Sequence, residues 1–332
     1  MEGVYIFMGK KNDAIVPFLK DKVHFADLLN GSLFNGEQVI APDELELLDS
    51  TSTSILQDKR RKKLAINRYR DIIMKWKNQM TFALLACEVQ ENVHYAMPVR
   101  NMLYDSLSYT KQIDDLWKCH TKEEKCDVSA NEFLSHFRKK DVIYPVITVV
   151  FYYGDEWDGN LDLHSMFSIN EDVWNDKSNR KLLKKYVPNY HINLINPTKM
   201  QDLSVFKSDL QLIFSMLKYK NDKEKLFRFT KDNSSYFKSI SNRTAYAIGA
   251  LLDSDRLLDK FLENDEKEDK NMCKAIEDLY NDGVTIGIQQ GIQGTVTALK
   301  SLNCSNDAII EKLVEVYGID RVEASKLLGV TM

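Results

Sequence analysis

The sequence shows no transmembrane run, no cysteine framework and no signal-peptide pattern. No apolar stretch among its 332 residues is long enough to span a bilayer. The five cysteines are scattered, odd in number and without a CxxC pair, so neither a disulfide framework nor a zinc site is indicated. Residues 1–13 do not follow the charged, apolar and small-residue order of a signal peptide. We therefore expect a cytoplasmic protein with no membrane partner.

An excess of positive charge is also missing. The chain has 45 lysines and arginines against 49 aspartates and glutamates, which gives a net charge of −4. Any DNA contact must therefore come from a local basic patch and not from the overall charge. The apolar share of 44% and the aromatic share of 10% fit a folded protein with a substantial core. The length allows one large domain or two ordinary ones.

Helical and strand patterns alternate in the first 197 residues. Apolar residues at helical spacing predict a helix over 18–33. Strands are predicted over 64–74 and 82–90, and a turn at 77–79 makes them an antiparallel pair.

Proline 98 then opens a predicted helix that runs to about Trp117. The β-branched and aromatic run 142–154 predicts an interior strand covered on both faces, and 190–195 predicts one more short strand. The order of these elements indicates a mixed α/β fold. The buried stripe of the predicted helix is expected to consist of Val99, Leu103, Leu107, Thr110, Ile113 and Trp117.

The character of the chain changes near residue 197. Residues 199–329 contain no proline, and their apolar spacing is helical almost throughout. We therefore predict a first domain over 1–197 and an all-α region over 198–332.

The end of this helical region carries glycines at intervals of four residues, at 283, 287 and 291. Their spacing allows two helices to approach closely. The second helix would belong to another copy of the chain or to a partner, or the two would form a tight pair within this chain. Two short helices are predicted to end the chain, with Ser305 capping the first and Gly318 ending it. They lack a basic recognition face, so a packing or dimerisation module is favoured over a helix-turn-helix.

Glu88, Val89 and Gln90, at the end of the strand 82–90, form the candidate site together with Asp71. Glu88 and Gln90 are two positions apart, so their side chains project from one face of the strand. Val89 faces the other way, and its carbonyl is a candidate further ligand. Hairpin pairing can bring Asp71 beside Glu88. Two carboxylates and a carbonyl make an all-oxygen site suited to Mg²⁺ or Mn²⁺.

The spacing of these residues is a weak signal when it is taken alone. Glu88 ends an apolar run, where an unpaired buried carboxylate is costly unless it binds a metal. The alternative is that the strand simply emerges into solvent at this point, since acidic strand ends are common.

Several segments in the same order resemble the Rpn-type family of recombination-promoting nucleases and transposases, within the PD-(D/E)XK nuclease superfamily. The longest is YRDIIMKWKNQMTFALLACEVQENVHYAMPVRNMLYDSLSYTKQI. The resemblance extends upstream to HFADLLNGSLFNGEQVI and downstream to VITVVFYYGDEWDG and NYHINLINP, and so covers most of residues 20–198. It implies a restriction-endonuclease-like core, in which a small mixed sheet is flanked by helices.

The resemblance also implies roles for particular residues. Asp71 in YRDII matches the family's metal-binding aspartate, and Glu88 in CEVQ matches its second carboxylate. Gln90 matches the third catalytic position, where many members of the superfamily have lysine. Asp27 in FADLLN matches an acidic residue of the first helix that is expected to assist the metal. Glutamine carries no charge, so at position 90 its role would be to orient the attacking water.

Other polar residues are candidates for DNA contact. Arg100 and Tyr104 fall within the motif MPVRNMLYD, where they would meet a phosphate near the metal; a solvated helix face is an equally weighted alternative. The basic run that contains Arg60 and Arg61 would hold the DNA backbone, or is a solvated loop. The residues predicted to contact DNA are Arg100, Tyr104, Lys111, Arg60 and Arg61.

These expectations combine into one leading function. The chain is predicted to be a Mg²⁺-dependent or Mn²⁺-dependent DNA endonuclease that hydrolyses phosphodiester bonds, connected with recombination, mobile elements or defence. The alternative is a DNA-binding or regulatory protein with a decayed nuclease core, which the glutamine at position 90 and the acidic net charge leave open.

Overall fold

The computed structural model describes residues 10–48, 51–57, 63–77, 82–121, 128–167, 181, 184–262 and 269–329. Two compact units emerge from the contacts within the chain. The first consists of Met1–Asn221 and Arg243–Ser254, and the second of Asp222–Asn242 and Asp255–Met332. Each unit is described by itself.

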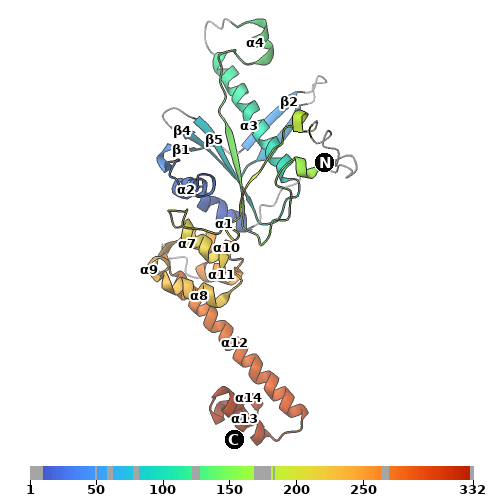
Figure 1. The fold of residues 1–332 in the computed structure, drawn as a ribbon. Helices are drawn as coiled ribbons and strands as arrows, with labels where there is room; N and C mark the ends of the chain where they lie inside the picture. Colours follow the sequence, from blue (N-terminus) through green and yellow to red (C-terminus); the bar gives the residue numbers. More distant parts are fainter. Residues whose placement is uncertain are drawn as a thin grey trace. The chain divides into compact units, whose positions relative to one another are not determined.

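The first unit is built on a five-stranded mixed sheet of order β1-β4-β5-β6-β7 (Figure 1). β4 runs antiparallel to both β1 and β5, whereas β5, β6 and β7 run parallel to one another. The interior strands are apolar and rich in β-branched residues, as strands covered on both faces require. The strands are β1 (Leu45–Leu47), β4 (Ile72–Lys77), β5 (Phe82–Gln90), β6 (Val146–Tyr152) and β7 (Asn193–Ile195).

Helices cover both faces of this sheet. Met97 at the start of α3 (Met97–His120) packs with Val150, which lies beside Glu88 in the parallel register of β5 and β6. Phe151 points the opposite way, because side chains alternate along a strand, and it stacks on Phe214 of α7 (Leu210–Lys218). The face that carries Glu88 therefore lies under α3.

Further helices complete the first unit. Asp21 caps α2 by accepting hydrogen bonds from the backbone of Val23 and His24, which fixes where that helix begins. The predicted helix over 18–33 is thus confirmed in its main part. These elements are α1 (Lys10–Leu19), α2 (Lys22–Leu33), η1 (Pro42–Glu44), α4 (Ala130–Ser135), η2 (His164–Met166) and α10 (Asn242–Leu251).

The predicted strand 64–74 is wrong as a single element. Its first part, β3 (Lys63–Tyr69), pairs with β2 (Thr51–Gln57) in a separate two-stranded sheet, and its last part joins β4. The chain changes partner at Arg70, whose buried guanidinium is held by Thr148 and Asp105.

The predicted strands 82–90, 142–154 and 190–195 correspond to β5, β6 and β7, and β6 is interior as expected. The antiparallel pairing of β4 with β5 is confirmed, with Ile72 opposite Cys87. Residues 78 and 79 of the predicted turn lie outside the described part of the chain.

The predicted buried stripe of α3 is wrong. Val99, Leu103 and Thr110 are exposed, and Leu107 is the one predicted member that is fully buried. The helix turns a largely polar face inward because its polar groups find distant partners inside the protein. The residues on this inner face include Met97, Asn101, Tyr104, Asp105 and Ser108.

The second unit is helical, with one short antiparallel strand pair. α7 and α10 follow residue 197 but belong to the first unit, so the compact units do not divide at the predicted position. The elements of the second unit are α8 (Lys223–Asp232), α9 (Ser234–Phe237), β8 (Ile240–Ser241), α11 (Asp255–Leu262), β9 (Asp269–Lys270), α12 (Met272–Ser301), α13 (Asn306–Tyr317) and α14 (Arg321–Leu328).

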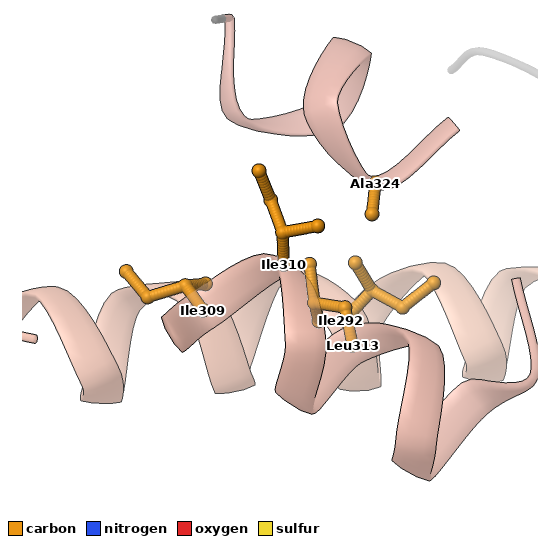
Figure 2. Packing of buried hydrophobic residues seen from close by; sticks show 5 residues of the cluster. All are labelled: Ile292, Ile309, Ile310, Leu313 and Ala324. Atoms are coloured by element: carbon orange, nitrogen blue, oxygen red, sulfur yellow. The ribbon is translucent and has the colours of Figure 1, made fainter. Parts of the chain in front are cut away.

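The last three helices close a small core, shown in Figure 2. The predicted cap at Ser305 and the left-handed end at Gly318 are confirmed. Gly291 lies against α13, where an added Cβ would come 3.1 Å from Oη of Tyr317, so the internal packing interpretation holds there. The core consists of Ile292, Ile309, Ile310, Leu313 and Ala324.

Gly283 and Gly287 behave differently from Gly291. Within the described part of the chain, an added Cβ on either would meet no atom within 4 Å. Self-association through these two glycines stays a prediction.

Candidate metal centre

The two predicted metal-binding carboxylates lie next to each other at one end of the central hairpin. Asp71 immediately precedes β4, and the β4–β5 register, extended by one residue, places it opposite Glu88. Its Oδ2 accepts a hydrogen bond from the backbone N–H of Val89 at 2.7 Å. Asp71 is therefore fixed at the strand end beside Glu88, as the sequence predicts.

Glu88 is a fully buried carboxylate with an incomplete set of partners. The residue is 0% exposed, and its Oε2 accepts from Nη2 of Arg100 at 3.2 Å. Its Oε1 finds no hydrogen-bond partner among the described residues. The alternative that β5 merely emerges into solvent at this point is thus wrong.

Burial and charge shape the titration of both groups. Burial, followed by the negative charge of Asp71, raises the pKa of Glu88 to about 8, against the opposing effect of Arg100 and Arg70. Burial also raises the pKa of Asp71, which the Val89 N–H, Arg100 and Lys20 partly offset. A fully buried carboxyl group beside the negative charge of a half-buried one is a setting that a divalent cation would relieve.

Gln90 lies two residues further along β5, next to Tyr152 of β6, and is half-buried. Strand alternation places it on the same face as Glu88. The ligand role of the Val89 carbonyl and the catalytic role of Gln90 remain predictions.

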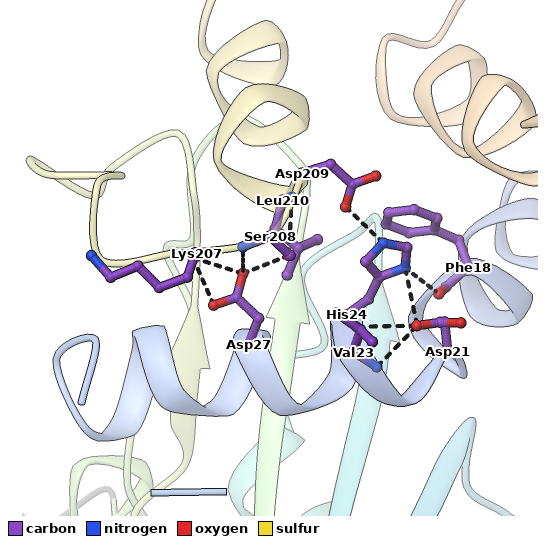
Figure 3. A network of polar contacts seen from close by, with 9 residues as sticks. All are labelled: Phe18, Asp21, Val23, His24, Asp27, Lys207, Ser208, Asp209 and Leu210. Atoms are coloured by element: carbon purple, nitrogen blue, oxygen red, sulfur yellow. Dashed lines mark hydrogen bonds and ion pairs between the residues drawn. The ribbon is translucent and has the colours of Figure 1, made fainter. Parts of the chain in front are cut away.

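Asp27 belongs to a different network, which joins α2 to the segment before α7 (Figure 3). Its two oxygens accept from the N–H of Lys207 and Ser208 and from Oγ of Ser208, at 2.5–3.0 Å. Among the described residues, no three Asp, Glu, His or Cys side chains gather as metal ligands. The predicted assistance of Asp27 to the metal is not supported, because its carboxylate anchors the segment before α7.

The predicted DNA-contacting residues of α3 have unlike surroundings. Arg100 pairs with Glu88, while the exposed Lys111 pairs with Asp115 at 3.2 Å. Tyr104 is only 6% exposed, and its ring centre lies 5.4 Å from the guanidinium carbons of both Arg70 and Arg100. It is not on a solvated face and has little surface to offer DNA. Arg60 and Arg61 lie outside the described residues.

A buried network beneath the site was missed at the sequence level. Arg70 donates to Oγ1 of Thr148 at 2.8 Å and to Oδ1 of Asp105 at 2.6 Å, and Tyr190 donates to Oδ2 of Asp105 at 2.5 Å. Burial and the hydrogen bond to Asp105 raise the pKa of the Tyr190 hydroxyl. Arg70 looks in sequence like part of a basic, solvated stretch, and its local pattern carries no sign of these partners.

Comparisons with known proteins found no match. No family model matches the chain, and neither a curated protein nor a solved structure does. Among the described helices, none has the length and apolarity needed to cross a membrane. What the protein does must therefore be argued from the site itself.

Proposed function

We propose that this protein is a metal-dependent DNA endonuclease that hydrolyses phosphodiester bonds, with Asp71 and Glu88 as the ligands of Mg²⁺ or Mn²⁺. The observation that carries the proposal is the burial of Glu88 opposite Asp71 with Oε1 unpartnered among the described residues. A buried carboxylate such as Glu88 is costly unless a cation or a hydrogen-bonded partner compensates for it.

The donor set fits a hard divalent cation. Mg²⁺ keeps several of its waters and commonly takes only one or two protein carboxylates, so a third acidic side chain is not required. When bound, the metal supplies Lewis acidity toward a phosphate oxygen and a water of lowered pKa. The membership in the Rpn-type family that the sequence motifs suggest is part of the same proposal.

The residues around the carboxylates have separate tasks in this proposal. The Val89 N–H donates to Oδ2 of Asp71 and so fixes the orientation of the carboxylate. The other oxygen, Oδ1, takes no part in that bond and is the one that would bind the metal. Arg100 holds Oε2 of Glu88 and is half-buried, so its guanidinium can also favour negative charge on a nearby phosphate. Gln90 has an uncharged amide, which can orient a water but cannot take up its proton at neutral pH.

Cleavage of supercoiled plasmid DNA tests this function. The parent should nick DNA with Mg²⁺ or Mn²⁺ and lose the activity in chelator, while Asp71→Asn and Glu88→Gln should abolish it with the fold intact. Glu224→Gln is the matched control, because Glu224 is an exposed glutamate of α8 that pairs only with Arg228 among the described residues. Cleavage by Glu88→Gln at the parental rate would show that the site is assigned wrongly.

One observation favours a second candidate, a DNA-binding or regulatory protein with an inactive core. Arg100 already forms an ion pair with Glu88 and so competes with a metal for that carboxylate. DNA binding that persists in Glu88→Gln, without cleavage by the parent under any divalent metal, would support this candidate instead.

A further inference from the structure

Asn101, on the inner face of α3, is a buried amide with unmet hydrogen bonds. The residue is 0% exposed, and neither Oδ1 nor Nδ2 has a hydrogen-bond partner among the described residues. An asparagine side chain offers two donor hydrogens and an acceptor oxygen. Buried side chains of this kind are nearly always hydrogen-bonded to protein, to ordered water or to a ligand, so Asn101 requires such a partner.

The helix geometry places Asn101 over the candidate metal centre. One turn earlier, Met97 packs against Val150, the register neighbour of Glu88. One turn later, Asp105 accepts a hydrogen bond from Thr148, the register neighbour of Ala86. Residues four apart share one face of a helix, so the Asn101 side chain faces the sheet at the level of residues 86–88.

Unpartnered polar atoms concentrate in the same place. Five buried side-chain atoms between residues 88 and 101 lack a hydrogen-bond partner among the described residues. They are complementary in kind: Glu88 contributes an acceptor, Nε of Arg100 a donor, and Asn101 both. The five atoms are Oε1 of Glu88, Nδ1 of His94, Nε of Arg100, and Oδ1 and Nδ2 of Asn101.

We propose that Asn101 is a positioning residue that, together with Nε of Arg100, holds an ordered water against Oε1 of Glu88. The complete burial of Asn101 keeps a DNA phosphate from reaching its amide, whereas a single water needs only two to four polar partners in a small space. The consequence for metal binding rests on the proposed function: a fixed water fixes the orientation of the Glu88 carboxylate.

The test compares two buried asparagines of opposite character. Asn30 is 1% exposed, but its Nδ2 and Oδ1 are both bonded to the backbone of Ile40 at 2.9 Å. Asn101→Leu should weaken Mn²⁺ binding, measured by titration calorimetry, by roughly 10- to 100-fold. Asn30→Leu should lower the denaturation midpoint and leave the Mn²⁺ affinity of the folded protein unchanged. An unchanged affinity in Asn101→Leu, in a parent that binds Mn²⁺, overturns the proposal.

A second measurement, made in chelator, does not depend on the metal. Denaturation midpoints are compared for the parent, Asn101→Leu, Glu88→Gln and the double variant, with Asn101→Ser as a replacement should Asn101→Leu fail to fold. A shared water makes the two shifts non-additive; additive shifts overturn the proposal. A parent that binds no Mn²⁺ defeats the proposed metal function alone, and the chelator measurement then decides the role of Asn101.

Discussion

Two of the buried carboxylates of the first unit, Asp27 and Glu88, have opposite surroundings. Asp27, which is 4% exposed, accepts hydrogen bonds from two backbone N–H groups and one hydroxyl. Glu88, which is 0% exposed, has one contact at 3.2 Å and one oxygen without a partner among the described residues. A carboxylate whose bonds are complete stabilises the fold, whereas one whose bonds are incomplete is suited to binding.

Removal of Arg70 should have the largest effect on stability. Its side chain is buried and links Asp105 to Thr148 beneath Glu88. Arg70→Met leaves a buried carboxylate without its cation, so the free energy of unfolding should fall by about 3–5 kcal/mol. Urea denaturation measures this loss, and Arg70→Met combined with Asp105→Leu should recover part of it. A loss below about 1 kcal/mol would mean that the network contributes little.

Asp27→Ala should have the next largest effect. It leaves the N–H groups of Lys207 and Ser208 without their acceptor, and we expect a loss of about 2–4 kcal/mol in urea denaturation. Asp202→Ala is the matched control, because Asp202 accepts from the N–H of Ser204 in the same segment but is exposed, and little change is expected there. Equal losses in the two variants would remove the contrast between Asp27 and Glu88.

Replacement of Glu88 should raise stability, whereas replacement of Arg70 or Asp27 should lower it. Because folding raises the pKa of Glu88 from 4.5 to about 8, its ionisation is harder in the folded state, so its contribution to stability is fully present below pH 4.5 and is lost as the pH rises through about 8. In chelator at about pH 8.5, Glu88→Gln should therefore be more stable than the parent by roughly 1–3 kcal/mol. A less stable Glu88→Gln would show that its contact with Arg100 already satisfies this carboxylate.

The smallest expected effect concerns His24, which lies near Asp27 on α2 (Figure 3). Burial lowers the pKa of His24, but the hydrogen bond and the charge of Asp209 and the carbonyl of Phe18 outweigh burial and raise it above 6.5. The protonated ring therefore contributes stability below pH 6.5 that is lost as the pH rises through the raised pKa.

The contribution of His24 should be on the order of 1 kcal/mol. It is measured from denaturation midpoints between about pH 5.5 and about pH 8.5. The parent should lose this stability with rising pH and His24→Gln should not. Parallel pH profiles for the two proteins would contradict the assignment.

The local sequence pattern is sufficient to predict β5, the strand that carries Glu88 and Gln90. β5 spans Phe82–Gln90 as its apolar run predicts, and the expected adjacency of Asp71 and Glu88 follows from the antiparallel register. Both depend on short-range rules, namely alternation along a strand and pairing across a hairpin.

The local sequence pattern does not predict the surroundings of a polar side chain whose partner lies far away in the sequence. Asp105 bonds to Arg70, 35 residues away, and to Tyr190, 85 residues away, so an apparently solvated face of α3 is buried. Asp27 likewise bonds to Ser208, 181 residues away, and is thereby committed to the fold. Neither periodicity nor spacing contains information on such partners, because only tertiary packing creates them.

The extended register between Asp71 and Glu88 has a consequence for how the chain tolerates insertions and deletions. The two carboxylates meet because Ile72 is paired with Cys87 in a ladder whose side chains alternate with a period of two. One residue added or removed within β4 or β5 would shift the pairing by one and send Asp71 or Glu88 to the opposite face of the sheet. Single-residue changes in the length of these two strands should therefore remove the site even where every side chain that forms it is retained.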